Sequence, residues 1–366
     1  MEKYRHIFER FATFDNMYDG YLKARKHKRQ QDCVLQYTNL LEDNLIDSVN
    51  RLQWHEYHTG QLHQFYEYYP KLRLISSLPF YDRVINCAAH NVLWPIYRKS
   101  MYEYSFGSIE EKGPIRASRT VQQWMRSYAR KPGDWYIVKM DIAKFFFRIP
   151  VDIQLRELSK PLDDPDMVWF LEQAIRCDGR PLGLPVYCTD VTTAERISGI
   201  GMQVGSLISQ MTANVVMTPT DYYIKRELLV PEHARFMDDM MCIVDGKKAA
   251  WEVVGYVDDY LRTNVGLQLN DKTAVIPLGK PVEFVGRKIT PDKIELRRQT
   301  SLGMKKHLRY VREAYGRGDV PLEYALSVIQ SYLGLMQDCN NDALRNQILE
   351  DYVLVRHSQD MLDAAE

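Results

Sequence analysis

The sequence predicts an α+β fold in which a small antiparallel sheet is combined with helical regions. Three observations support this prediction. The run 136–149 is mostly apolar and rich in β-forming residues, and the segment 234–246 places two short hydrophobic runs on either side of an acid pair. Long stretches before and after these segments carry apolar residues at helical spacing. Because strands joined by short turns pair antiparallel, we expect a sheet of that kind.

The N-terminal third is predicted to be mainly helical. A basic cluster at 22–31 has two open interpretations, a solvated face or a contact with nucleic acid. An amphipathic helix should follow, with its apolar positions at Leu40, Leu41, Leu45, Ile46, Val49 and Leu52. The aromatic segment 64–74 alternates around Pro70 and predicts a small hairpin. Helical spacing returns at 81–103 and again before Arg130.

The second half predicts a long helix, a hairpin, two further strands and a helical C-terminal region. The long helix is entered through Gly205 and Ser206, and another helix is expected at 249–264. Strands are expected at 274–278 and 282–289. The segment 287–317 holds ten Lys or Arg and three Asp or Glu, although the whole chain has no formal net charge. A polarised surface is therefore predicted.

Composition excludes several classes of protein. The chain has 366 residues, of which 45% are hydrophobic and 26% charged, as in soluble globular proteins. No apolar run reaches the roughly 18 residues of a membrane span, and the opening residues lack the apolar core of a secretory signal, so we expect a cytoplasmic protein. The six cysteines are scattered without a CxxC pair, which indicates neither a disulfide framework nor a closed zinc site.

Three carboxylates have the surroundings of a metal site. Asp141 interrupts a buried strand, which costs free energy unless a cation or hydrogen bonds compensate it, and the pair Asp238–Asp239 lies at the predicted hairpin tip. Carboxylate oxygens are the ligands that Mg²⁺ prefers. Two such ions about 4 Å apart stabilise the entering and leaving oxygens in displacement at phosphorus. We therefore predict nucleotidyl transfer at these residues.

A second acid pair, Asp258–Asp259, lies in the segment Tyr256-Val257-Asp258-Asp259 and competes for the same interpretation. Its neighbourhood has helical periodicity, carried by Val253, Val254, Val257 and Leu261. This spacing predicts that Asp258 and Asp259 lie on the solvated side of a helix, so we assign the metal site to Asp238–Asp239.

An ordered series of motifs resembles one family. LQWHEYHTG and YYPKLRLISSLPFYDRVI are followed by MDIAKFFFRI, VGSLISQ, FMDD, LQLNDKT, FVGRKI and SYLGLMQDCNNDALRNQIL. The chain is similar to bacterial and phage reverse transcriptases of the group II intron-like group, most closely to those of diversity-generating retroelements. The resemblance implies a right-hand polymerase, with an N-terminal extension and fingers at 1–135, a palm and part of the fingers at 136–290, and a helical thumb and tail at 291–366.

The resemblance also implies roles for individual residues. Arg73 would hold the triphosphate of the incoming nucleotide, and Lys71 would either assist it or be a solvated lysine. Phe146 would be the ring that excludes a ribose 2′-hydroxyl. Lys272 would lie near the leaving pyrophosphate and neutralise charge or donate a proton. The backbone carbonyl of Ile142 is expected to be a metal ligand besides Asp141, Asp238 and Asp239.

The segment Gly205–Gln210 has the GxxxSQ pattern typical of diversity-generating enzymes. Val204 precedes it, where many other reverse transcriptases carry glutamine. Valine has no side-chain hydrogen bond to offer, so we expect weak checking of the nascent base pair and low fidelity. Val204, Gly205 and Gln210 are therefore predicted to contact the nucleotide and template.

The resemblance implies an RNA-directed DNA polymerase that makes cDNA mutagenised at adenines. It would use two Mg²⁺ ions, deoxynucleoside triphosphates and a structured template RNA, and would act with a small basic pentameric helical accessory protein in a bacterial cytoplasm. Two alternatives stay open. One is the reverse transcriptase of a retron, a group II intron or an abortive-infection system, and the other is a non-catalytic palm that serves as an RNA-binding scaffold.

Overall fold

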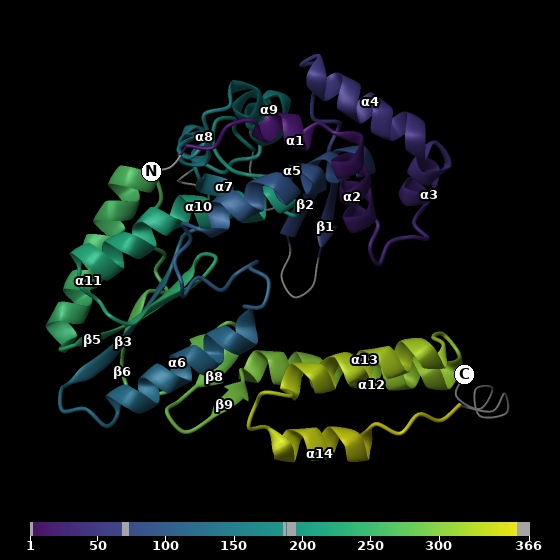
Figure 1. The fold of residues 1–366 in the computed structure, drawn as a ribbon. Helices are drawn as coiled ribbons and strands as arrows, with labels where there is room; N and C mark the ends of the chain where they lie inside the picture. Colours follow the sequence, from purple (N-terminus) through teal and green to yellow (C-terminus); the bar gives the residue numbers. More distant parts are fainter. Residues whose placement is uncertain (1–2, 68–72, 186–187, 189–194, 357–366) are drawn as a thin grey trace. The chain divides into compact units, whose positions relative to one another are not determined.

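The computed structural model describes residues 3–67, 73–185, 188 and 195–356. The chain forms two compact units (Figure 1). The first comprises Met1–Ser108, Met140–Met240 and Trp251–Thr273, and the second comprises Ile109–Lys139, Met241–Ala250 and Ala274–Glu366. Three elements pass from one unit to the other, namely β3 (Trp135–Asp141), β5 (Asp239–Asp245) and α11 (Lys247–Tyr260). The three-part division into fingers, palm and thumb stays a prediction.

Helices make up most of the first unit. They are α1 (Ile7–Phe11), α2 (Phe14–Ala24), α3 (Asp32–Asn39), α4 (Leu41–Gln53), α5 (Phe80–Arg98), α7 (Phe145–Arg148), α8 (Val151–Ser159), α9 (Pro165–Arg176) and α10 (Leu207–Tyr222). Both α2 and α10 pack against α5 (Figure 1). Helix α2 approaches α5 so closely that a Cβ atom at Gly20 would lie 2.6 Å from the carbonyl oxygen of Val84. Only glycine permits this backbone approach.

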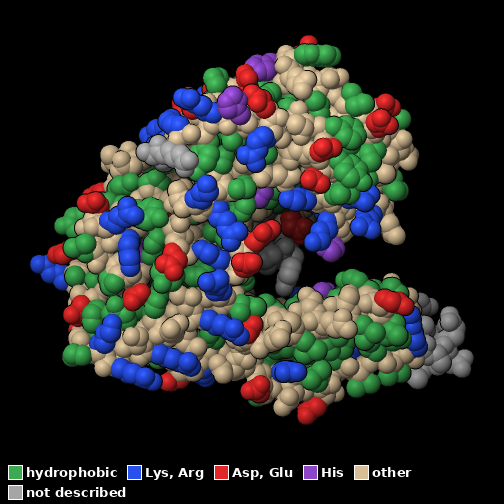
Figure 2. All heavy atoms as spheres, in the orientation of Figure 1, with side chains coloured by type: hydrophobic (Ala, Val, Ile, Leu, Met, Phe, Trp, Pro, Cys, Tyr) green, Lys and Arg blue, Asp and Glu red, His purple; other side chains and the backbone are tan. Residues whose placement is uncertain are grey.

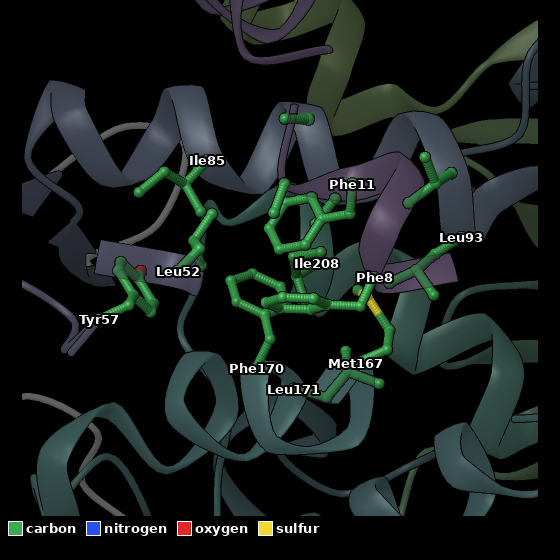
Figure 3. Packing of buried hydrophobic residues seen from close by; sticks show 14 of the residues in the cluster. Phe8, Phe11, Leu52, Tyr57, Ile85, Leu93, Met167, Phe170, Leu171 and Ile208 are labelled. Atoms are coloured by element: carbon green, nitrogen blue, oxygen red, sulfur yellow. The ribbon is translucent and has the colours of Figure 1, made fainter. Parts of the chain in front are cut away.

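The core of the first unit joins the N-terminal helices to α9. Figure 3 shows Phe8 and Phe11 of α1 meeting Met167 and Phe170 of α9. The ring centroids of Phe11 and Phe170 are 4.5 Å apart. Buried Asp164 ties the two helices together, because its carboxylate accepts hydrogen bonds from the backbone nitrogens of Ile7 (2.6 Å), Phe8 (2.9 Å) and Met167 (3.0 Å). These bonds satisfy N-terminal donors of both helices.

The strands form three sheets. The predicted hairpin at 64–74 is confirmed as β1 (His63–Glu67) paired antiparallel with β2 (Arg73–Ser77). A four-stranded sheet has the order β4-β5-β3-β6, where β4 is His233–Phe236, β6 is Ala274–Pro277, and β3 pairs antiparallel with β6. The third sheet consists of β7 (Val282–Phe284), β8 (Arg287–Ile289) and β9 (Ile294–Leu296), all antiparallel. The strand expected at 274–278 is confirmed as β6, whereas the single strand expected at 282–289 is wrong, because a turn at Val285 and Gly286 divides this range into the paired strands β7 and β8.

The run 136–149 forms a strand only up to Asp141. The next two backbone nitrogens turn to other segments, since Ile142 donates to the carbonyl oxygen of Asp238 (3.3 Å) and Ala143 donates to that of Gln268 (2.9 Å). Lys144 then adopts a left-handed conformation (φ 50°), and α7 follows. The β-forming composition of this run is thus overridden by contacts that residues distant in sequence provide.

The second unit contains α6 (Pro114–Tyr128) and the helical C-terminal region, made of α12 (Arg298–Arg317), α13 (Leu322–Met336) and α14 (Asp342–Asp351). Helices α12 and α13 lie side by side (Figure 1). One buried cluster holds Met304 and Leu308 of α12, Ile329 and Met336 of α13, and Ile348 of α14. Met304 and Leu308, four residues apart on α12, are both buried, and the predicted helical C-terminal region is confirmed.

Basic and acidic side chains are interspersed on the face drawn in Figure 2, in keeping with the absence of a formal net charge. Within the part of the chain that the structure describes, no helix combines the length and apolar character needed to cross a bilayer.

Candidate active site

Two of the predicted carboxylates lie at adjoining chain segments. Asp141 is the last residue of β3, and Asp238 completes the turn between β4 and β5. The hydrogen bond from Ile142 N to Asp238 O (3.3 Å) keeps these segments together. Asp239 begins β5, the neighbour of β3 in the sheet. All three carboxylate residues are partly buried.

The turn that carries Asp238 is strained and tightly supported. Its first residue, Met237, has a φ of 58°, a conformation that non-glycine residues adopt at a cost. Gly107 lies directly against it, since a Cβ atom at position 107 would be 2.6 Å from Met237 Cγ and 2.8 Å from Met237 N. Arg235 lies in β4, and its Nη1 donates a hydrogen bond to the carbonyl oxygen of Met237 (3.2 Å). These two neighbours determine where the turn lies.

Arg235 belongs to a fully buried polar network. Its Nε lies 2.9 Å from both carboxylate oxygens of Asp221, and its Nη2 lies 2.8 Å from Asp221 Oδ2. Asp221 also contacts His233 Nε2 at 2.8 Å, and Arg235 Nη1 donates to Asn214 Oδ1 at 3.1 Å. Although burial alone would raise the pKa of Asp221, Arg235 and His233 hold it below its ordinary value. The carboxylate is therefore charged and fixes the guanidinium beneath the turn.

Asn270 connects Asp141 to the loop that carries Lys272. Asn270 Nδ2 donates to Asp141 Oδ2, and Asn270 N donates to the carbonyl oxygen of Asp141 (2.8 Å). Asn270 Oδ1 in turn accepts from Lys272 N (2.8 Å). Lys272 itself is exposed. The predicted lysine thus lies two residues from a direct partner of Asp141.

The competing pair lies on a helix, as predicted. Asp259 of α11 is exposed, but Asp258 is half-buried and accepts a hydrogen bond from Leu269 N (2.7 Å). Its other oxygen pairs with Arg262 at 2.7 Å. Asp258 therefore holds the segment that leads to Asn270, a structural role that the helical spacing did not predict.

The second group of predicted residues consists of Phe146 and of Val204, Gly205 and Gln210 before and in α10. The carbonyl oxygen of Phe146 accepts from Met202 N (2.7 Å), which aligns the two segments. Val204 is half-buried, Gly205 is exposed with a φ of 98°, and Gln210 lies half-buried in the first turn of α10. Gly205 needs its positive φ to lead the chain into the helix.

The structure does not describe the side chains of two predicted residues. Lys71 lies outside the described residues. Arg73 begins β2, but its side chain is outside the described part of the chain. Their contacts with the triphosphate stay predictions.

The donor set suits magnesium chemically. Asp141, Asp238 and Asp239 offer hard oxygen ligands, and Mg²⁺ commonly takes only one or two carboxylates from a protein and completes its shell with water and phosphate oxygens. Within the described ranges, no group of three or more His, Cys, Asp or Glu side chains is gathered around one point. Asp238 lies in the turn and Asp239 is the first residue of the strand that follows it. The arrangement fits ions shared with a substrate phosphate.

The family of the chain follows from its sequence. Residues 68–289 match the family described as reverse transcriptase (RNA-dependent DNA polymerase). The match spans more than half of the chain, and the protein belongs to this family. Together with the antiparallel sheet and its helices, this membership confirms the predicted α+β fold of a right-hand polymerase.

Two known proteins are distantly similar to the chain. Protein YkfC of Escherichia coli (strain K12) is 20% identical over 252 residues, which cover 60% of this chain and 63% of YkfC. The chain thus spans less than two thirds of this relative. A solved structure of telomerase from Candida albicans, in complex with the TWJ fragment of telomeric RNA, is 14% identical with a TM-score of 0.44. That match covers 80% of this chain and 55% of the telomerase chain.

Sequence reasoning missed the residues that support the site, namely Gly107, Asn214, Asp221, His233, Arg235 and Asn270. One signal was available. Arg235 lies inside the first of the two short hydrophobic runs at 234–246, and a charge that is buried in such a place requires a partner. Gly107 and Asn270 left no comparable signal, because their contacts depend on residues more than 100 positions away.

Proposed function

We propose that this chain copies RNA into error-prone cDNA as the reverse transcriptase of a diversity-generating retroelement. The hydrogen bond between Ile142 N and Asp238 O supports the polymerase assignment most directly, because it keeps the end of β3 beside the acid pair. In this proposal Asp141, Asp238, Asp239 and the Ile142 carbonyl hold two Mg²⁺ ions. When bound, such ions stabilise the entering and leaving oxygens at phosphorus.

The remaining predicted residues act on the nucleotide. Lys272 neutralises charge near the leaving pyrophosphate, and Arg73 with Lys71 holds the triphosphate. Phe146 excludes the ribose 2′-hydroxyl, which makes deoxynucleoside triphosphates the substrates. The bond between Phe146 O and Met202 N supports this role, because it holds Phe146 next to the segment that leads to Val204.

In this proposal, the low fidelity of copying depends on Val204. Its side chain cannot form a hydrogen bond with the nascent base pair. The neighbouring glutamine does not replace it, since Gln203 is buried and its Nε2 donates to the carbonyl oxygen of Ser76 (3.2 Å). The pattern Gly205–Gln210 supports the same subfamily, in which mutagenesis is directed to adenines.

The proposed partners are a structured template RNA, the cDNA product and a small basic pentameric helical accessory protein. A polymerase without formal net charge gains little general affinity for phosphate backbones. A basic partner would supply that attraction.

Primer extension on a defined RNA template tests the proposal. The reaction contains Mg²⁺ and all four deoxynucleotides, and the cDNA from wild type, Val204→Gln and the apolar control Val204→Ile is sequenced. We expect substitutions concentrated opposite template adenines in wild type and Val204→Ile, and several-fold fewer in Val204→Gln. Faithful wild-type cDNA would contradict the diversity-generating assignment and favour a retron, intron or defence enzyme. No incorporation at all would contradict the polymerase.

A further inference from the structure

The hairpin that carries Arg73 receives little support from the sheet that it forms. Strands β1 and β2 make a two-stranded sheet of their own, and all five residues of β1 are exposed. A two-stranded hairpin is at best marginally stable in water unless it packs against other elements. The position of this hairpin is therefore set largely where its two ends join the rest of the first unit.

The incoming end of the hairpin is held by Asp82, in the first turn of α5. The buried Asp82 carboxylate accepts a hydrogen bond from Gly60 N (3.2 Å) at Oδ2 and one from Tyr57 Oη (2.7 Å) at Oδ1. Arg180 Nη1 in addition donates to the carbonyl oxygen of Gly60 (2.7 Å). Both backbone polar groups of Gly60 are thus bound, shortly before β1 begins at His63.

The contact at Gly60 leaves no room for a side chain. A Cβ atom at position 60 would lie 2.8 Å from Asp82 Oδ2 and 3.0 Å from Pro79 Cγ. The preceding residue is also fixed, because Thr59 Oγ1 donates to the carbonyl oxygen of Gln173 in α9 (3.1 Å). The chain therefore enters the hairpin along a path that α5 and α9 determine.

The outgoing end of the hairpin is held by the next residue of the same helix. Arg83 Nη2 donates to Ser77 Oγ (2.5 Å) at the end of β2, and Arg83 Nε donates to the carbonyl oxygen of Leu78 (2.9 Å). Within β2, the carbonyl oxygen of Ser76 accepts from Gln203 Nε2 (3.2 Å). Two consecutive charged residues of α5 thus contact opposite ends of the hairpin.

Helix α5 is a rigid base for these contacts. The residues that follow Asp82 and Arg83 lie in the core of the first unit, where four side chains have no solvent exposure: Val84, Ile85, Ala88 and Ala89. Helix α2 packs closely against this part of α5, since a Cβ atom at Gly20 would lie 2.9 Å from Ala88 N. Side chains on packed elements are held more precisely than side chains on loops. Asp82 and Arg83 therefore have well-defined positions.

We propose that Asp82 and Arg83 are positioning residues for the incoming nucleotide, because they hold the two ends of the hairpin that presents Arg73. This inference rests on the proposed function, in which Arg73 holds the triphosphate. Neither residue touches the nucleotide. Asp82 acts through the incoming end of the hairpin and Arg83 through the outgoing end. Loss of either contact lets the hairpin shift relative to the metal site, and a misplacement of about 1 Å is costly even when it arises far from the reacting atoms.

Steady-state kinetics of primer extension test the role of Asp82. The KM for one deoxynucleotide and kcat are measured for wild type, Asp82→Ala and Asp82→Asn, at a temperature at which circular dichroism shows each variant folded. The alanine variant removes the acceptor of Gly60 N. The asparagine variant keeps both bonds, because its amide oxygen accepts from Gly60 N while its amide nitrogen donates to Tyr57 Oη. The control Asp164→Ala removes another buried carboxylate that accepts backbone N–H groups, but from α1 and α9 rather than from the hairpin.

We expect Asp82→Ala to raise KM about tenfold while kcat stays within about twofold of wild type, since a displaced Arg73 weakens a contact made in the ground state and the transition state alike. Asp82→Asn and Asp164→Ala should keep the wild-type KM. An unchanged KM in Asp82→Ala would overturn the inference. An equal rise in Asp164→Ala or in Asp82→Asn would overturn it as well.

Hydrogen–deuterium exchange, measured by mass spectrometry, tests the same contacts without catalysis. Peptides that cover β1 and β2 are compared between wild type, Asp82→Ala and Ser77→Ala, which removes the hydroxyl that Arg83 contacts. Ser77 is half-buried, so this variant should fold even if Asp82→Ala does not. We expect several-fold faster exchange of these peptides in both variants and no change in α9.

The exchange experiment also separates the failure of this inference from the failure of the proposed function. Unchanged exchange of the hairpin in both variants would overturn the inference whatever the activity. If exchange rises as expected but wild type incorporates no nucleotide, Asp82 and Arg83 still hold the hairpin, and their role in nucleotide binding falls with the proposed function.

Discussion

Arg235 Nη1 donates a hydrogen bond to the carbonyl oxygen of Met237 over 3.2 Å, immediately before Asp238. The same guanidinium is held by Asp221, in a pair with no solvent exposure on either side chain. A buried pair of this kind is costly to break, because the remaining charge stays in the interior without its partner. The acid pair of the candidate site is thus positioned by a charge pair that is fully buried beneath it.

The variant Arg235→Lys should separate the role of Arg235 in positioning the turn from its role as the positive charge beside Asp221. Lysine keeps the positive charge for Asp221 but lacks the planar fork that also reaches Met237. We expect kcat for nucleotide incorporation to fall at least tenfold, the half-saturating Mg²⁺ concentration to rise, and stability to drop by about 1–3 kcal/mol. Magnesium titrations of primer extension and urea unfolding measure these effects. Arg51→Lys, at an exposed pair with Asp47, is the control and should change neither. An unchanged magnesium dependence in Arg235→Lys would reduce Arg235 to a purely structural residue.

Gly107→Ala should displace the turn from the other side. The new methyl group would lie 2.8 Å from the backbone nitrogen of Met237, so the turn itself would have to move. We expect a loss of activity of about tenfold or more, since small misplacements of reacting groups are costly. The control is Gly255→Ala on α11, where a Cβ meets no atom within 4 Å. It should leave activity intact and stabilise the helix by up to about 1 kcal/mol. Equal activity of the two variants would show that Gly107 does not position the turn.

The variant Asn270→Ala should reduce activity, because Asp141 loses a hydrogen-bond partner. The variant removes the amide that donates to Asp141 Oδ2 and the oxygen that accepts from Lys272 N. We expect kcat to fall roughly tenfold with little change in template affinity, as measured by single-turnover incorporation. Asn264→Ala removes an exposed side-chain bond to Tyr260 O and should have no such effect. A loss confined to template affinity would contradict this role for Asn270.

The stability of the first unit should depend on pH through His90. Burial, with a smaller contribution from Lys23, lowers the pKa of His90 from 6.5 to about 4. Between these values the unfolded chain binds a proton that the folded chain does not, so stability falls as pH decreases from about 6.5 towards 4. At pH 5 the loss is at most about 2 kcal/mol relative to pH 7.5. Urea unfolding of wild type and His90→Gln at both pH values measures it. The variant should lose less stability than wild type, and equal losses would contradict the assignment.

The parts of the site that local patterns define were predicted from the sequence. Asp141 ends an apolar strand, and Asp238 lies in a hairpin turn, so each has its own signal in the neighbouring residues. Periodicity likewise placed the competing pair on a helix. The strand ends at Asp141 although 142–149 is also rich in β-forming residues, and composition does not reveal that Ile142 and Ala143 bond to distant segments.

The residues that hold the site in place, such as Gly107 and Asn270, could not be predicted in the same way. Gly107 and Met237 are 130 positions apart, and Asn270 and Asp141 are 129 apart, so no local pattern links them. The sequence also does not reveal the conformation of Met237, since a positive φ in a turn is expected of glycine or asparagine rather than methionine. Such contacts arise only when packing brings the segments together.

The most direct test of the account is templated incorporation of a deoxynucleotide by wild type, Asp141→Asn, Asp238→Asn and Asp259→Asn. Magnesium at the site is worth several kcal/mol of transition-state stabilisation, which corresponds to roughly a thousandfold in rate. We expect losses of this order in Asp141→Asn and Asp238→Asn. Asp259→Asn, in the acid pair on α11, should retain wild-type activity. Full activity in Asp238→Asn, or a comparable loss in Asp259→Asn, would contradict the assignment of the active site.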